Sequence, residues 1–284
     1  MARPLAALIG VLALLAQASP AWATWSIVAV DRTTGRSVMA LATCAYIDAH
    51  FLSSMTAVVA PGKGIAACQA AVDAFGGDQK LILEGLRQGR DPAAILAELA
   101  RSPAFARRQF GIVDLKGRSA GATGRDDPPR AGQVRGKLPG AEIYYSIQGN
   151  TLTTDQLVPA VQKAFAETPG ALTDRVMAAL EAGDRAGGDS RCVCGPNSLG
   201  AAMSPPCDNA HSQVAFILMS EPGDPAGPTS IDVRPAMYIS VSPPGPARRN
   251  DDQINLLRGD SPNPVKTLRR RYDVWRKAQP ASFR

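Results

Sequence analysis

The sequence has very little histidine and lacks several short motifs of familiar catalytic sites. His50 and His211 are the only histidines among 284 residues. A Ser-His-Asp triad, in which histidine supplies the base, is therefore disfavoured, and each histidine is expected to be a surface or core residue. The chain also contains no G-x-S-x-G, no H-E-x-x-H and no phosphate-binding glycine loop, so these motifs assign no reaction.

Composition and charge exclude further classes. A chain with 45% hydrophobic and 20% charged residues is not a disordered chain, a collagen or a polytopic membrane protein. The net charge of +6 is concentrated near the end, because residues 248–284 hold ten basic and four acidic side chains. Residues 24–247 hold twenty basic and twenty-one acidic ones. This near-neutral body disfavours nucleic acid as a partner.

The first 23 residues have the pattern of a secretory signal peptide. Arg3 precedes an apolar stretch over 5–16, and Ala-Trp-Ala at 21–23 forms an A-x-A cleavage site. The alternative is an uncleaved membrane anchor, but the apolar run is short for a bilayer. We expect an exported protein, periplasmic or secreted, whose mature chain begins at Thr24. A free α-amine there could serve as the base that activates the threonine hydroxyl.

The pattern along the mature chain predicts an α+β fold. Hairpins are followed by pairs of helices, which favours antiparallel sheets covered by helices rather than alternating βαβ units. Asp91-Pro92 is typical of a helix start. Predicted strands cover 25–30, 36–43, 54–60, 65–68, 109–114, 118–123, 143–148, 213–219 and 231–241. Predicted helices lie within 69–101, 155–167, 171–182 and 262–277, and 124–140 reads as a loop or lid.

Several short segments together resemble one bacterial family. These are Thr-Trp-Ser-Ile-Val-Ala-Val-Asp at 24–31, Phe-Gly-Ile-Val-Asp at 110–114, Ile-Gln-Gly-Asn-Thr-Leu at 147–152, Leu-Glu-Ala-Gly at 180–183, Ala-Gly-Gly-Asp at 186–189 and Leu-Arg-Arg-Arg-Tyr at 268–272. The chain resembles the domain of unknown function number 1028, whose members look like N-terminal nucleophile (Ntn) hydrolases. Family members typically begin with Met-Thr, and here the predicted cleavage point falls directly before the equivalent Thr24.

The resemblance implies a four-layer αββα sandwich and an amidohydrolase without a cofactor. Thr24 would attack a small amide or peptide-like substrate. Asn150 would donate a hydrogen bond to the oxyanion, although a turn residue after Gly149 is an alternative role. Asp31 would hold the Thr24 ammonium, although capping the turn at 33–35 is an alternative role. Asp189 and Arg191 would clamp a substrate carboxylate or the α-amine, or would form a structural ion pair. Gln148 would orient substrate or would simply follow the alternation of its strand, and Thr43 would line the site.

The cysteines depart from the family pattern. Cys192, Cys194 and Cys207 lie in an insertion, and with His211 they could form a zinc site. Because export favours oxidation, we expect instead a disulfide between Cys207 and either Cys192 or Cys194. Cys44 and Cys68 are candidates for a second pair. No metal is assigned.

The domain organisation follows from these observations. Residues 1–23 are the signal peptide, 24–241 the Ntn-hydrolase-like domain, and 242–284 a basic segment ending in an amphipathic helix. The basic residues of that segment could bind a cell-envelope polymer, or could form an ordinary solvated face. The competing function is a non-catalytic envelope-associated binding protein on the same scaffold. A homo-oligomer is left open.

Overall fold

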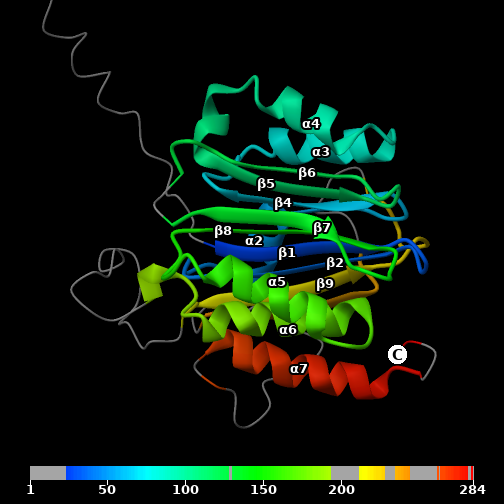
Figure 1. Cartoon of the computed structure of the whole chain (residues 1–284), viewed down its shortest axis with the longest axis vertical. Coiled ribbons are helices and arrows are strands. Elements are labelled where there is room, and N and C mark those ends of the chain that lie inside the picture. Colours follow the sequence, from blue (N-terminus) through cyan, green and yellow to red (C-terminus); the bar gives the residue numbers. More distant parts are fainter. Residues whose placement is uncertain are drawn as a thin grey trace, which may run out of the picture.

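The computed structural model describes residues 24–127, 130–192, 211–227, 234–243, 261, 263–280 and 283. Two antiparallel sheets lie face to face and carry helices on their outer faces, giving the αββα layering visible in Figure 1. The α+β class and the antiparallel sandwich expected from the sequence are confirmed. No helix in the described part of the chain combines the length and apolar composition that a bilayer crossing requires.

The larger sheet has six strands in the order β10-β9-β2-β1-β8-β7. Its members are β1 (Thr24–Asp31), β2 (Arg36–Thr43), β7 (Gly132–Lys137), β8 (Ile143–Asn150), β9 (Val214–Ser220) and β10 (Met237–Val241). The smaller sheet has the order β3-β4-β5-β6. Its strands are β3 (Ala57–Ala60), β4 (Gly64–Ala70), β5 (Arg108–Asp114) and β6 (Ser119–Thr123).

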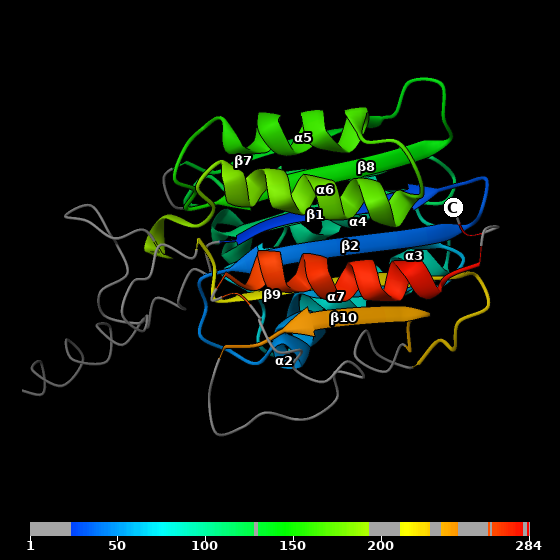
Figure 2. The ribbon, with the colours of Figure 1, turned by 90° about the horizontal axis from the view of Figure 1, so that it is seen from below.

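The helices form two outer layers. Figure 2 shows α5 (Leu157–Glu167), α6 (Leu172–Arg185) and α7 (Pro264–Ala278) side by side in front of the larger sheet, across its outer face. The smaller sheet is covered by α3 (Gly77–Arg87) and α4 (Pro92–Leu99). The remaining described helices are α2 (Ala49–Thr56) and the short 3₁₀ turns η3 (Pro103–Arg107) and η4 (Ser190–Cys192).

Strand β1 lies inside the larger sheet, between β2 and β8, and both of its faces are buried. Trp25 and Ile27 point toward the helices of the larger sheet, whereas Val28 and Val30 point into the space between the sheets. This alternation follows the two-residue period of a strand. The inner face therefore also includes Thr24 and Ser26, so the space between the sheets is apolar at one end and polar at the other.

Two elements differ from the sequence prediction. The stretch 54–60 was expected to be a strand, but the chain forms α2 first and only then β3. The cause is local: the Asp48 carboxylate accepts hydrogen bonds from the backbone N–H groups of His50 and Phe51 and caps this helix. The loop expected at 124–140 contains β7, which pairs with β8 and extends the larger sheet.

The C-terminal segment contributes to the same core. Val265, Leu268 and Tyr272 of α7 are buried against the larger sheet and α6. Arg269 pairs with Glu181 of α6, and Arg276 pairs with Asp174. Arg271 donates to the carbonyl of Ser240. Half of the basic side chains of α7 thus hold the helix in place, while Lys266, Arg270 and Lys277 are exposed.

Candidate active site

Three residues singled out from the sequence meet at one end of the larger sheet. Thr24 begins β1 and lies directly opposite Thr43 on β2 and Asn150 on β8. Directly opposite residues in an antiparallel pair carry their side chains on the same face, with Cβ atoms about 5 Å apart. Thr24 is 1% exposed, and Thr43 and Asn150 are fully buried. We call this the Thr24 end of the sandwich.

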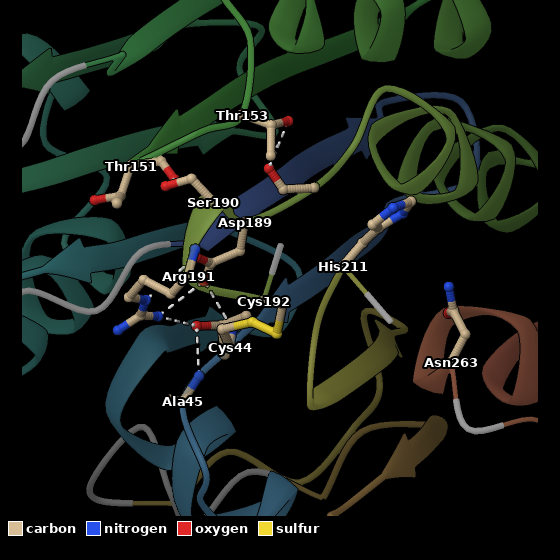
Figure 3. The surroundings of a disulfide bond; sticks show 12 residues. Cys44, Ala45, Thr151, Thr153, Asp189, Ser190, Arg191, Cys192, His211 and Asn263 are labelled. Carbon is tan, nitrogen blue, oxygen red and sulfur yellow. Dashed lines mark hydrogen bonds and ion pairs between the residues drawn. A yellow bond between two sulfur atoms is a disulfide. The ribbon is translucent and has the colours of Figure 1, made fainter. Parts of the chain in front are cut away.

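Asp189 and Arg191 are held against the same end. The Arg191 guanidinium donates to the Asp189 carboxylate at 2.8 Å and to the Thr43 hydroxyl at 3.2 Å. Asp189 is fully buried, and its Oδ2 also accepts the backbone N–H of Cys44 at 2.8 Å. Figure 3 shows Asp189, Arg191 and Cys44 together beside the disulfide. Burial raises the pKa of Asp189, and the Arg191 guanidinium opposes that effect.

Asp31 does not belong to this site. It is the last residue of β1 and pairs with Arg36, seven residues from Thr24. That separation is about 24 Å in an extended strand. Its carboxylate accepts hydrogen bonds from the Thr33 N–H and the Thr34 hydroxyl, both at 2.9 Å. The expectation that Asp31 holds the Thr24 ammonium is therefore wrong, and its role is to cap the turn.

Gln148 lies in a chain of polar side chains between the two sheets. Its Nε2 donates to Ser26 Oγ at 2.6 Å, Ser26 donates to Gln69 Oε1 at 2.6 Å, and Gln69 donates to Gln109 Oε1 at 2.7 Å. Asn150 donates to the same Gln109 oxygen at 3.3 Å. All these side chains are 1% exposed or less. Gln148 thus contacts protein groups rather than an open pocket.

Gly111 of β5 leaves space for this row of hydrogen-bonded side chains. A Cβ on Gly111 of β5 would lie 2.1 Å from Gln148 Oε1 and 2.6 Å from Ser146 Oγ. The sheets therefore approach closely enough for side chains of β8 to rest on the backbone of β5. Sequence reasoning gave Gln69 and Gln109 no role. The available signal was a polar residue at an inward position of an otherwise apolar strand.

The cysteine pairing differs from the prediction. Cys44, which follows Thr43, forms a disulfide with Cys192. Cys68 is a buried free thiol in the smaller sheet, so the expected Cys44–Cys68 pair is wrong. The bond to Cys44 also removes Cys192 from the expected pairing with Cys207 and from the zinc set. Cys194 and Cys207 lie outside the described residues.

Next to Asn150, Thr151 has an unusual backbone. Its φ is +53°, in the left-handed region that β-branched residues rarely occupy. Its carbonyl accepts hydrogen bonds from both the N–H and the hydroxyl of Ser190, at 3.0 and 2.8 Å. These contacts connect the end of β8 to the segment that carries Asp189 and Arg191. Strain of this kind costs about 1–3 kcal/mol and is found preferentially at functional sites.

The chain is thus an αββα protein with a buried polar cluster at the start of its central strand. A family model described as a family of unknown function, DUF1028, matches residues 24–204. Because the match covers more than half of the sequence, the chain belongs to this family. The match begins at Thr24.

A solved structure shows the same fold. Protein SPO2555 from Silicibacter pomeroyi, which is assigned to the same family model, aligns with a TM-score of 0.61. The two are 21% identical, and the alignment covers 92% of this chain and 91% of that one. No curated protein matches the sequence.

Proposed function

We propose that this protein is an exported amidohydrolase of the Ntn type, with Thr24 as its nucleophile after removal of residues 1–23. The observation that carries the proposal is the place of Thr24. It starts the central strand on the inner face, between Thr43 and Asn150. The predicted cleavage point and the start of the family match fall on the same residue.

The reaction would proceed in two steps. The Thr24 hydroxyl adds to the amide carbonyl while the α-amine takes its proton. When the tetrahedral intermediate collapses, the C–N bond breaks and the ammonium returns the proton to the leaving amine. Water then hydrolyses the Thr24 ester and releases the acid. In the uncleaved chain the nitrogen of residue 24 is an amide and has no basic lone pair, so cleavage would activate the enzyme.

Arg191 supports a substrate with an anionic group. Its guanidinium lies beside Thr43 at the Thr24 end, and its side chain retains 18% exposure. The buried Asp189 holds the guanidinium in a bidentate contact and fixes its plane. A carboxylate on a small amide or peptide-like substrate is the chemistry that such a group recognises. The disulfide supports export, because disulfides persist in oxidising compartments.

The test is covalent labelling of defined chain ends. Four chains are prepared: one starting at Thr24, one with a single alanine before it, and the Thr24→Ala and Thr24→Ser variants. Each is treated with an acylating β-lactone and analysed by peptide mass spectrometry. We expect an ester on residue 24 in the first chain and in Thr24→Ser, and none in the other two. An absence of the ester in the chain that starts at Thr24, or equal labelling of the chain with the extra alanine, would contradict the proposal and favour the binding protein.

A further inference from the structure

The polar chain between the sheets has a defined direction. Gln109 Nε2 donates to the backbone carbonyls of Gly132 and Gly149, at 3.2 and 3.0 Å, and to the Thr123 hydroxyl at 2.8 Å. Backbone carbonyls can only accept, so the Gln109 amide cannot be turned around without facing oxygen against oxygen. Its Oε1 must therefore point toward Gln69 and Asn150.

This direction determines how the Asn150 amide is oriented. Since Gln109 presents an acceptor, Asn150 must face it with the Nδ2 donor. Asn150 Oδ1 is then directed away from Gln109. This oxygen is buried and has no hydrogen-bond partner in the described part of the chain. An unsatisfied buried acceptor costs about 1–3 kcal/mol, so a fully buried one at a functional site requires an explanation.

A group that can become a donor lies on the neighbouring strand, namely the nitrogen of residue 24. Thr24 is the register partner of Asn150 on the neighbouring strand. In the uncleaved chain that nitrogen is a backbone amide. Cleavage before Thr24 would convert it into an amine or ammonium, which carries two or three donors on a group that can turn.

We propose that Asn150 Oδ1 accepts a hydrogen bond from the Thr24 α-amine in the processed chain, and that Asn150 is therefore the residue that positions the catalytic base. The inference rests on the proposed function only for the processing before Thr24. It adds an acceptor role to the donor role expected for Asn150, because Nδ2 carries two hydrogens and the bond to Gln109 uses one of them. Gln109 has a positioning role one step further away, since it sets the orientation of the Asn150 amide.

The other charged groups at this end do not take that role. Asp189 already accepts four hydrogen bonds: Oδ1 from the Arg191 N–H and Nε, and Oδ2 from the Cys44 N–H and an Arg191 terminal nitrogen. Both carboxylate oxygens are thus occupied. From the smaller sheet, the neighbouring residues are the neutral Gln69 and Gln109. Asp31 is at the far end of β1.

The experiment measures the pKa of the α-amine directly, without a substrate. A chain starting at Thr24 is labelled with ¹³C-threonine, and the Thr24 signal is followed against pH. Asn150→Asp places a carboxylate against the ammonium and should raise the pKa of the α-amine by about one to three units. Asn150→Ala removes the acceptor and should lower it. Asp31→Asn is the matched control at the opposite end of the same strand and should leave it unchanged.

The outcomes separate this inference from the proposed function. A pKa that moves in opposite directions in Asn150→Asp and Asn150→Ala supports the α-amine contact. If Asn150→Asp does not fold, Asn150→Ala alone decides, because an unchanged pKa in that variant overturns the inference. The titration does not depend on activity, so a failure of Thr24 to form an ester contradicts the nucleophile and leaves this measurement standing.

Discussion

The Asp189 carboxylate accepts the backbone N–H of Cys44 at 2.8 Å, so a residue after α6 is fixed to the end of β2 across 145 positions of sequence. The disulfide between Cys44 and Cys192 makes a second connection between the same two segments. Together they hold Arg191 beside Thr43 and define one wall of the Thr24 end. A disulfide and a charge-assisted hydrogen bond thus join the same two segments, and each can be removed separately.

Removing the Asp189 carboxylate should lower the stability of the protein. Asp189→Asn leaves the Arg191 guanidinium without its carboxylate in a largely buried place. We expect the free energy of unfolding to fall by about 2–4 kcal/mol, because breaking a buried pair strands a charge. Urea denaturation followed by circular dichroism measures this. Glu84→Gln is the control, since the exposed Lys80–Glu84 pair should contribute less than about 0.5 kcal/mol. If Asp189→Asn and Glu84→Gln lowered the free energy of unfolding equally, the Asp189–Arg191 pair would not contribute as a buried ion pair.

Removing the covalent connection should also destabilise the protein. The disulfide closes a segment of 148 residues. The double variant Cys44→Ser, Cys192→Ser should lose about 2–5 kcal/mol of unfolding free energy. Peptide mapping of the oxidised protein should recover the Cys44–Cys192 link, with Cys68 alkylated only after unfolding because it is buried. A Cys44–Cys68 peptide, or rapid labelling of Cys68 in the folded protein, would contradict the observed pairing.

Asp127 should make stability depend on pH. Burial raises its pKa to about 6, and the hydrogen bond from the Gly124 N–H offsets only part of this. Because the folded-state pKa lies above the unfolded one, stability is greatest below the unfolded pKa near 4. It is lost as the pH rises through about 6.

Asp127→Asn should therefore stabilise the protein at pH 7.5 by about 1 kcal/mol, a value discounted for the partial exposure of this side chain. At pH 4 the variant and the unchanged protein should unfold alike. Denaturant titrations at the two pH values test this, and a gain that is the same at both would show that Asp127 does not ionise in this range.

The sequence predicts most strands of the two sheets, with β7 the exception, and only part of the site. Strand periodicity places Thr24 and Thr43 at the ends of a hairpin, and the same periodicity could have excluded Asp31, which is seven strand residues from Thr24. The helix α2 was missed because a single cap, Asp48, overrides an apolar stretch that otherwise favours a strand. Local signals of this kind are readable once the cap is recognised.

Contacts between residues that are far apart in the sequence could not be predicted in this way. Gln69 and Gln109 acquire their role only when the second sheet is laid on the first. Likewise, Cys44 meets Cys192 only because α6 returns the chain to the end of β2. No spacing along the sequence encodes these contacts. What the sequence does record is their consequence, namely polar residues at inward positions of apolar strands.

Gly183 provides the sharpest test of how the helix layer supports Thr24. A Cβ at this position would lie 2.4 Å from the Nε1 atom of Trp25. Trp25 is fully buried, adjoins Thr24, and donates Nε1 to the Leu180 carbonyl at 3.2 Å. In an exposed helix, Gly→Ala gains about 1 kcal/mol. Here overpacking should outweigh that gain, so Gly183→Ala should lose about 1–3 kcal/mol of unfolding free energy.

The displaced indole should also disturb the start of β1, so acylation of Thr24 should fall in the same variant. Gly223→Ala is the matched control, because a Cβ there meets no atom within 4 Å. It should change neither stability nor labelling by a measurable amount. If Gly183→Ala instead stabilised the protein as an ordinary helical substitution does, Trp25 would not be packed against α6. The helices over the larger sheet would then make no close contact with Trp25, the residue that follows Thr24.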